Sequence, residues 1–473
     1  MAVITGKKPH VLVVPFPAQG HVKPLMKLSS QLAKHGIKVT FVNIECVHEK
    51  IVSSAKMSEE EVVDVDMDED NLVLMSVSDG RSPDDDQNDI FKLLDTLQSS
   101  MPQSLMSLIE TINSSSSDEK ISCVIADITM SWISETAEKM GVEFVAFSPP
   151  SAAAIAIVNL IPKLLEEGIL DQNGSKTNGE ITRLSDDIPA WRKDEFSWSF
   201  SIDLKTQKIF FDCSRRVEKT AAQAKLVISN TCYELEPAAC DLNSNFLPVG
   251  PLNLLDLNGP KSRSRSCNFH PEDLSCLSWL DSKPDGSVIY VSFGSLAVFS
   301  QQQLDELALG LEMSGRAFLW VVRSDLANGS QAVFPDGFLE RVGEVGKIVE
   351  WAPQEKVLSH ASVACFLSHC GWNSTLEGLS MGLPYLCWPY FSDQFHNQSY
   401  ICDKWEIGLR IDPDENGIRS SHEIKKKVDL LFCDDKFRKN AKRFKEMTAK
   451  SVNEGGSSHK NLNKFIDHLR KRR

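Results

Sequence analysis

The chain has 473 residues, with 51 Lys and Arg against 65 Asp and Glu, so its formal charge is −14. Its length predicts two or three domains. Hydrophobic residues make up 42% and charged residues 25%, a globular mixture that excludes a mainly disordered chain or a collagen-like repeat. The acidic balance argues against general binding to nucleic acid or to an anionic membrane, although it leaves room for a local anion site.

Signals for targeting, membrane insertion and disulfides are weak. The apolar run at 11–16 is too short for a signal peptide. The longest apolar stretch, 152–161, is also too short to span a bilayer. The 12 cysteines include no CxxC pair, which predicts scattered reduced thiols. We therefore expect a cytoplasmic protein without a transmembrane segment.

The N-terminal part begins with a strand, a turn, a helix and a second strand. Residues 10–16 form a continuous apolar run, typical of a parallel strand that is buried on both faces. A helical pattern through Leu25, Leu28 and Leu32 follows, and 38–42 predict the next strand. The same order returns later in the chain and defines a second domain.

This second domain opens with a strand at 288–293. A helical pattern over 304–311 and a strand at 318–322 follow. Repeated strand, turn and helix openings predict two doubly wound α/β domains in tandem. The expected division is an N-terminal domain, a linker, a C-terminal domain and a final helix that packs back on the N-terminal domain, at 1–250, 251–275, 276–450 and 451–473.

A histidine and an aspartate lie at the ends of two predicted strands in the N-terminal domain. His21 follows the first strand, and Asp127 ends the apolar run 121–126. Because ligands bind beyond the carboxyl ends of parallel strands, the two side chains could meet there, with Asp127 orienting His21 as a general base. The alternative is that His21 caps the following helix and Asp127 is a turn residue.

The C-terminal domain carries a denser cluster after the strand at 363–367. Residues 368–371 follow the strand, and 372–377 open a helix. Small polar residues at a helix start leave backbone N–H groups unpaired, and the helix dipole there favours an anion. His369, Asn373 and Ser374 could donate hydrogen bonds to a phosphate, and Glu377 could accept them from ribose hydroxyls. An ordinary capped helix is the alternative. The expected anion site contains backbone dipoles and neutral donors rather than Lys or Arg.

Residues 351–394 begin with WAPQ, continue through HCGWNSTLE at 369–377 and end in Asp393 and Gln394. This block resembles the 44-residue signature box of plant UDP-dependent glycosyltransferases, family 1. PFPAQGH at 15–21, Asp127, PVGP at 248–251 and SFGS at 292–295 are similar to that family as well. The resemblance covers nearly the whole chain and implies the GT-B fold, with two Rossmann-like domains facing across a cleft.

The resemblance also assigns positions to a UDP-sugar donor. Trp351 would stack on uracil, and backbone atoms of Ala352 would contact its edge. Gln354 and Glu377 would hold the ribose. The other implied positions are Ser295, His369, Gly371, Asn373 and Ser374 for the diphosphate, and Trp372, Asp393 and Gln394 for the sugar.

The reaction implied by the resemblance is inverting transfer of glucose, because a final Gln in the box usually accompanies glucose. His21, backed by Asp127, would remove a proton from a hydroxyl or carboxyl of a small apolar acceptor of plant secondary metabolism. Helix dipole and neutral donors would stabilise the leaving UDP. UDP-glucose is then a co-substrate, and we expect no cofactor, no metal and a monomer. Trp132, Phe147 and the aromatic stretch 191–200 could line the acceptor pocket, although core packing explains each as well.

Three other functions fit less well. Residues 378–382 match the G-x-S-x-G of hydrolases, but a helix precedes the serine and a strand follows it, the reverse of a nucleophile elbow. A dinucleotide oxidoreductase would need G-x-G-x-x-G after a first strand, and neither domain has it. A sugar-nucleotide sensor without catalysis remains possible, and only turnover distinguishes it.

Overall fold

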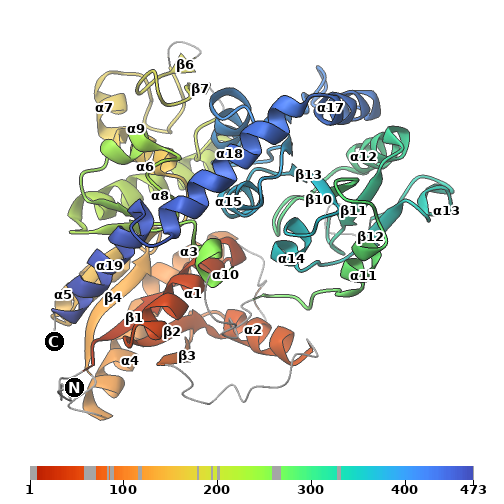
Figure 1. Cartoon of the computed structure of the whole chain (residues 1–473). Helices are drawn as coiled ribbons and strands as arrows, with labels where there is room; N and C mark the ends of the chain where they lie inside the picture. The colour runs from red at the N-terminus through yellow and green to blue at the C-terminus, as the bar shows by residue number, and fades with distance from the viewer. Residues whose placement is uncertain are drawn as a thin grey trace. The chain divides into compact units, whose positions relative to one another are not determined.

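A computed structural model describes residues 8–57, 71–82, 85, 90–115, 120–177, 181–192, 195–199, 203–257, 268–326 and 332–471. Contacts divide the chain into two units (Figure 1). The first comprises Met1–Gly168, Lys208–Pro271 and Ser451–Arg473, and the second comprises Ile169–Gln207 and Glu272–Lys450. Within the linker expected at 251–275, residues 258–267 lie outside the described residues, and the division by contacts places the chain up to Pro271 in the first unit.

Within the described residues, the first unit is built on a seven-stranded parallel sheet with the order β3-β2-β1-β4-β5-β8-β9. All five residues of β1 are buried, as expected for a strand covered on both faces. The strands are β1 (His10–Val14), β2 (Lys38–Ile44), β3 (Leu72–Val77), β4 (Ile121–Asp127), β5 (Glu143–Ser148), β8 (Val227–Ser229) and β9 (Phe246–Pro248).

Helices separate these strands along the chain, so the fold is of the doubly wound α/β type. They are α1 (Gln19–Lys34), α2 (Glu45–Met57), α3 (Ile90–Ser99), α4 (Met101–Ser115), α5 (Trp132–Lys139), α6 (Ala152–Asn159), α7 (Ile161–Glu166), α8 (Leu204–Gln223), α9 (Pro237–Asp241), α10 (Leu252–Leu257) and α19 (Ser457–Arg470). The strand order reverses between β1 and β4, where Val14 is in register with Ala126. Ligands of such sheets bind beyond the strand ends at this reversal.

The second unit repeats the plan. The part of it that the structure describes holds a six-stranded parallel sheet with the order β12-β11-β10-β13-β14-β15. The strands are β10 (Val288–Ser292), β11 (Ala317–Val321), β12 (Gly346–Val349), β13 (Val363–Ser368), β14 (Tyr385–Cys387) and β15 (Gly408–Arg410). The order reverses between β10 and β13, where Ser292 is in register with Ser368.

The helices of the second unit differ widely in length. They are α11 (Ser275–Asp281), α12 (Gln301–Ser314), α13 (Phe338–Val342), α14 (Gln354–Leu358), α15 (Trp372–Met381), α16 (Gln394–Ser399), a π-helix (Tyr400–Lys404), α17 (Ser421–Cys433) and α18 (Asp435–Val452), which continues into the first unit. Among the described residues of either unit, we find no helix with both the length and the apolar character that a bilayer span requires.

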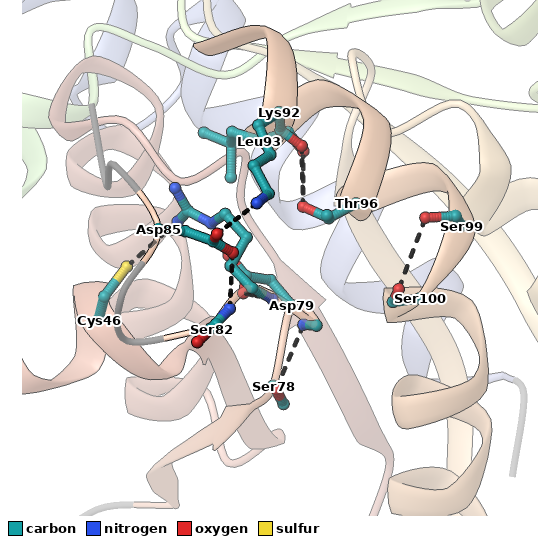
Figure 2. A network of polar contacts seen from close by, with 12 residues as sticks. Cys46, Ser78, Asp79, Ser82, Asp85, Lys92, Leu93, Thr96, Ser99 and Ser100 are labelled. Atoms are coloured by element: carbon teal, nitrogen blue, oxygen red, sulfur yellow. Dashed lines mark hydrogen bonds and ion pairs between the residues drawn. The ribbon is translucent and has the colours of Figure 1, made fainter. Parts of the chain in front are cut away.

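A network of polar contacts stabilises the loop that follows β3, at the carboxyl edge of the first sheet (Figure 2). The buried Asp79 accepts hydrogen bonds from the backbone N–H of Arg81 at 3.0 Å and from its Nε at 2.7 Å. Lys92 on α3 pairs with Asp85 and lowers the pKa of that carboxyl. A hydrogen bond of 2.8 Å from the Ser82 N–H also reaches Asp85. These contacts link the loop to α3.

One segment before residue 250 belongs to the second unit, although the expected domain boundary would place it in the first. Ile169–Gln207 belongs to the second unit, where β6 (Ile181–Thr182) and β7 (Trp191–Arg192) form an antiparallel pair. The physical reason is aromatic packing, because Trp191 stacks on His396 of α16 with ring centroids 3.7 Å apart and an interplanar angle of 3°. The aromatic stretch 191–200 was expected in the N-terminal domain, but its described aromatic residues are buried within the second unit.

The last helix, α19, packs in the first unit (dark blue in Figure 1). Ser458 Oγ donates to the Gly250 carbonyl at 2.6 Å, and Asn461 Nδ2 donates to the Pro248 carbonyl at 2.8 Å. The fully buried Phe465 joins the core of this unit. The end of the chain is therefore part of the first unit's core rather than an appended tail.

Phe465→Ala should destabilise the first unit by about 3–5 kcal/mol, because it removes a large side chain from a closed core. Lys464→Ala changes the neighbouring exposed residue of the same helix and should leave stability nearly unchanged. Denaturant unfolding of both variants measures the difference. Equal stability of the two variants would show that α19 contributes no core packing.

His396 makes the second unit sensitive to acid. Its Nε2 donates to the Pro189 carbonyl at 2.8 Å, and its buried Nδ1 has no hydrogen-bond partner within the described residues. Burial lowers the pKa of His396 to about 4, against the hydrogen bond to Pro189, which favours the charged ring. A histidine in the unfolded chain titrates near ~6.5.

As the pH falls, His396 is therefore protonated in the unfolded chain before it is protonated in the folded protein. The free energy of unfolding consequently decreases between about pH 6.5 and about pH 4. Over that range His396 should remove about 3 kcal/mol. His396→Gln should give a flatter profile of unfolding free energy against pH than the wild type. His422→Gln, which replaces an exposed histidine of α17, should follow the wild type. Parallel profiles for all three proteins would contradict this assignment.

Candidate active site

His21 and Asp127 meet at the strand reversal of the first sheet. His21 Nδ1 lies 2.7 Å from Asp127 Oδ2. The Asp127 side chain is fully buried, whereas the His21 side chain is 29% exposed. Because the carboxylate can only accept, this contact favours the tautomer with the proton on Nδ1 and the lone pair on Nε2. The pair therefore presents a basic nitrogen on a partly exposed ring.

The second oxygen of Asp127 fixes the carboxylate. Oδ1 accepts hydrogen bonds from the Thr129 N–H at 3.0 Å and from Thr129 Oγ1 at 2.6 Å. These contacts hold Asp127 in the orientation that meets His21. The alternative role of His21 as a helix cap does not hold, because Ala18 is the N-cap of α1 and His21 lies within the first turn.

A polar network in the second unit centres on Gln354, the first residue of α14. Its Nε2 donates to Glu377 Oε2 at 2.6 Å and to Ser374 Oγ at 3.0 Å. Its Oε1 accepts from the Tyr290 hydroxyl at 3.1 Å. The structure thus brings together three of the positions expected to bind the donor, Gln354, Ser374 and Glu377, from two different helices. Tyr290, on β10, was not anticipated from the sequence.

His369 follows β13 at the strand reversal of the second sheet, and two glycines pack against its ring. A Cβ on Gly294 would lie 2.8 Å from His369 Nε2, and a Cβ on Gly371 would lie 2.4 Å from the same atom. Gly294 also has a φ of 70°, which favours glycine. Only glycine at both positions lets the backbone approach the imidazole this closely.

Burial lowers the pKa of His369 to about 4. The Ser292 backbone opposes this lowering of the pKa by favouring the charged ring, whereas the Arg323 charge adds to it. The ring is therefore neutral near neutral pH. A neutral imidazole has one N–H donor, which suits contact with a phosphate oxygen.

The turn between His369 and α15 is held by side chains. Cys370 has a φ of 65°, unusual for a residue with a side chain. Its N–H donates to Ser368 Oγ at 3.1 Å, and its carbonyl accepts from Asn397 Nδ2 at 3.0 Å. Gly371 is the N-cap of α15 and makes no side-chain cap hydrogen bond. The N-cap position itself therefore carries no side chain that could close the helix start.

Asp393 and Gln394 lie at the start of α16, which Asn397 links to the same turn. Asp393 Oδ2 accepts from Asn397 Nδ2 at 3.0 Å. Gln394 Oε1 accepts from the N–H groups of Tyr390 and Phe391 at 2.8 and 3.1 Å, so its amide nitrogen is the atom suited to donate to a ligand. Asn397 was not anticipated from the sequence.

The remaining expected donor positions have distinct surroundings. Trp372 is buried and packs against Trp405 with ring centroids 6.3 Å apart, so its side chain serves the core. The Trp351 carbonyl accepts from the Asp273 N–H at 2.9 Å, and Ala352 is buried.

Ser295 lies in the turn after β10 and is partly exposed. Asn373 lies in the first turn of α15, also partly exposed. The hydrolase alternative fails in the structure, because Ser380 is buried within α15 rather than raised on a strand-to-helix turn. Among the described residues, no group of three or more His, Cys, Asp or Glu side chains is arranged to hold a metal ion.

Comparison with known proteins places these features in a family. The sequence family described as UDP-glucoronosyl and UDP-glucosyl transferase matches residues 34–450. The chain is 40% identical to UDP-glycosyltransferase 83A1 of Arabidopsis thaliana, and the match covers 98% of this chain and 97% of that protein. It is 34% identical to 7-deoxyloganetin glucosyltransferase of Gardenia jasminoides, over 98% of each chain.

The fold is shared with solved structures. The structure of Os79 from O. sativa in complex with UDP superposes with a TM-score of 0.79 at 27% sequence identity, and it covers 97% of this chain and 100% of that chain. Together with the two parallel sheets, this similarity establishes a GT-B fold. The chain therefore belongs to the UDP-glycosyltransferase family and is a transferase enzyme.

Proposed function

We propose that the protein is an inverting, UDP-glucose-dependent glucosyltransferase. It transfers glucose to a hydroxyl or carboxyl group of a small apolar metabolite of plant secondary metabolism. The observation that carries this proposal is the 2.7 Å hydrogen bond between His21 Nδ1 and the buried Asp127. A histidine that a carboxylate orients, and whose ring is partly exposed, is suited to act as a general base. Activation of the acceptor requires such a base, because the acceptor must lose a proton.

In this proposal His21 Nε2 takes the proton from the acceptor oxygen as that oxygen attacks the anomeric carbon. The sugar–phosphate bond breaks on the opposite face, so an α-linked donor yields a β-glucoside and UDP leaves. Asp127 stabilises the imidazolium that forms and keeps the ring in one tautomer. His21 then releases its proton to solvent.

The second unit carries the donor in this proposal. The Gln354 network would hold the ribose, since Gln354 and Glu377 already share a hydrogen bond of 2.6 Å. The leaving diphosphate would be stabilised by the neutral His369, by Ser295 and by the start of α15 at Gly371. These groups meet the leaving-group charge through hydrogen bonds and dipoles, so we propose that neither a metal nor a cofactor takes part.

Two observations favour glucose as the sugar. Gln394 has its amide oxygen occupied by backbone N–H groups, which fixes the amide so that its nitrogen can donate to a sugar hydroxyl. The relative from Gardenia jasminoides is named a glucosyltransferase. The solved structure of Os79 contains UDP, which supports a UDP-linked donor.

His21→Ala should lower the rate of transfer by about 100- to 10,000-fold, because it removes the general base. Binding of UDP should be unchanged, since the donor positions lie in the second unit. His35→Ala is the matched control: it replaces an exposed histidine at the other end of α1 and should retain full activity. UDP release and calorimetric UDP binding are the measurements. Transfer by His21→Ala at a near-normal rate would overturn the assignment of the base.

An acceptor screen tests the function itself. The wild-type protein is incubated with UDP-glucose and a panel of small phenols, alcohols and carboxylic acids, and products are scored for UDP release and for a mass gain of one hexose. We expect at least one apolar acceptor to gain a hexose. Saturable binding of UDP-glucose without transfer to any acceptor would instead favour a sugar-nucleotide sensor.

A further inference from the structure

A buried arginine lies beside the turn that follows β10. Arg323 comes two residues after the end of β11 and is 4% exposed. Its Nη1 donates to the Gly294 carbonyl at 2.6 Å, and its Nη2 donates to the Ala297 carbonyl at 2.8 Å. Its Nε donates to Asp325 Oδ1 at 2.8 Å. One guanidinium therefore holds two carbonyls of the same turn.

One backbone hydrogen bond joins the same two loops, and a second orders the loop after β11. The Phe299 N–H donates to the Leu326 carbonyl at 2.8 Å, and the Leu326 N–H donates to the Arg323 carbonyl at 3.1 Å. The first bond ties the chain just after the turn to the loop after β11, and the second lies within that loop, so the turn at 294–297 itself is held at both ends by the Arg323 side chain. Ser295 lies inside this turn, so its position depends on the anchor.

The anchor also sets which way the turn directs its polar groups. In a trans peptide the C=O and the following N–H point in opposite directions. Because the Gly294 carbonyl points at Arg323, the N–H of Ser295 points away from it. The Arg323 side chain therefore determines where the Ser295 N–H can meet a ligand.

The same anchor controls the spacing between the turn and His369. A Cβ on Gly294 would lie only 2.8 Å from His369 Nε2, so the turn already touches the imidazole. A small movement of Gly294 would either press on the ring or open a gap beside it. By fixing the turn, Arg323 therefore helps to hold Ser295 and His369 in a constant relative position.

Charge adds a second effect. Asp325, the carboxylate that pairs with Arg323, is 62% exposed, so water screens it. The guanidinium is buried, and a buried charge acts more strongly on its surroundings than an exposed one. The turn consequently has a fixed positive charge next to it, although it contains no Lys or Arg itself.

We propose that Arg323 is a positioning residue for the donor diphosphate, which it serves by fixing the turn at 294–297 against His369 and by placing a buried positive charge beside that turn. This inference rests on the proposed function, because it takes a UDP-sugar as the ligand. Arg323 acts through Ser295 and His369 rather than by touching the reacting atoms.

The test compares UDP with uridine, which lacks the diphosphate, by calorimetric titration of the full chain. Arg323→Met should lower UDP affinity about tenfold or more while uridine affinity stays within about twofold, because the hydrogen bonds of Arg323 go to Asp325 and to the turn rather than to the Gln354 network. Arg323→Lys keeps the charge but cannot bond both carbonyls in one planar fork, so it should lose less UDP affinity than Met. Arg316→Met is the matched control, because Arg316 flanks the other end of β11, and both affinities should match the wild type.

The possible outcomes separate this inference from the proposed function. An unchanged ratio of UDP to uridine affinity in Arg323→Met overturns the positioning role. Equal losses for UDP and uridine in both Arg323 variants would also overturn it, because they indicate a general structural role. Thermal unfolding of each variant identifies folding defects, and Arg323→Lys then carries the test. Failure of the wild type to bind UDP would instead contradict the proposed function.

Discussion

The reversal of strand order in each parallel sheet is the constraint on which the candidate site depends. Parallel strands end at a common edge, and at a reversal the loops that follow two adjacent strands turn to opposite faces and leave room between them. In the first sheet this places His21 after β1 beside Asp127 at the end of β4. In the second sheet it places the turn at Gly294 after β10 against His369 after β13.

The two reversals carry different chemistry. At the first, a buried carboxylate and a partly exposed imidazole form a pair that is suited to proton removal. At the second, burial keeps His369 neutral, and glycine allows the backbone to approach it. The acidic net charge of −14 is compatible with the anion site proposed there, because its proposed donors are uncharged and the buried Arg323 acts only through the turn beside it.

Strands were predicted correctly where the sequence has a continuous apolar run, because a strand buried on both faces needs apolar residues at successive positions. The strand expected at 363–367 is β13, Val363–Ser368. Contacts between segments far apart in the chain could not be predicted in this way. Trp191 stacks on His396, and Ile169–Gln207 therefore belongs to the second unit instead of the first. The sequence analysis missed three residues, Tyr290, Arg323 and Asn397. Each makes a hydrogen bond to another polar group near the candidate site, and none belongs to a recognised sequence motif. A charged residue soon after a buried strand, as at Arg323, is the signal that could have found one of them.

In the proposed reaction one base, His21, drives a single displacement at the anomeric carbon of UDP-glucose. The configuration of the product distinguishes a single from a double displacement. Proton nuclear magnetic resonance of the glucoside formed from α-linked UDP-glucose reports the coupling of the anomeric proton. We expect the large coupling of a β-glucoside, and a product with the small coupling of an α-glucoside would contradict a single displacement.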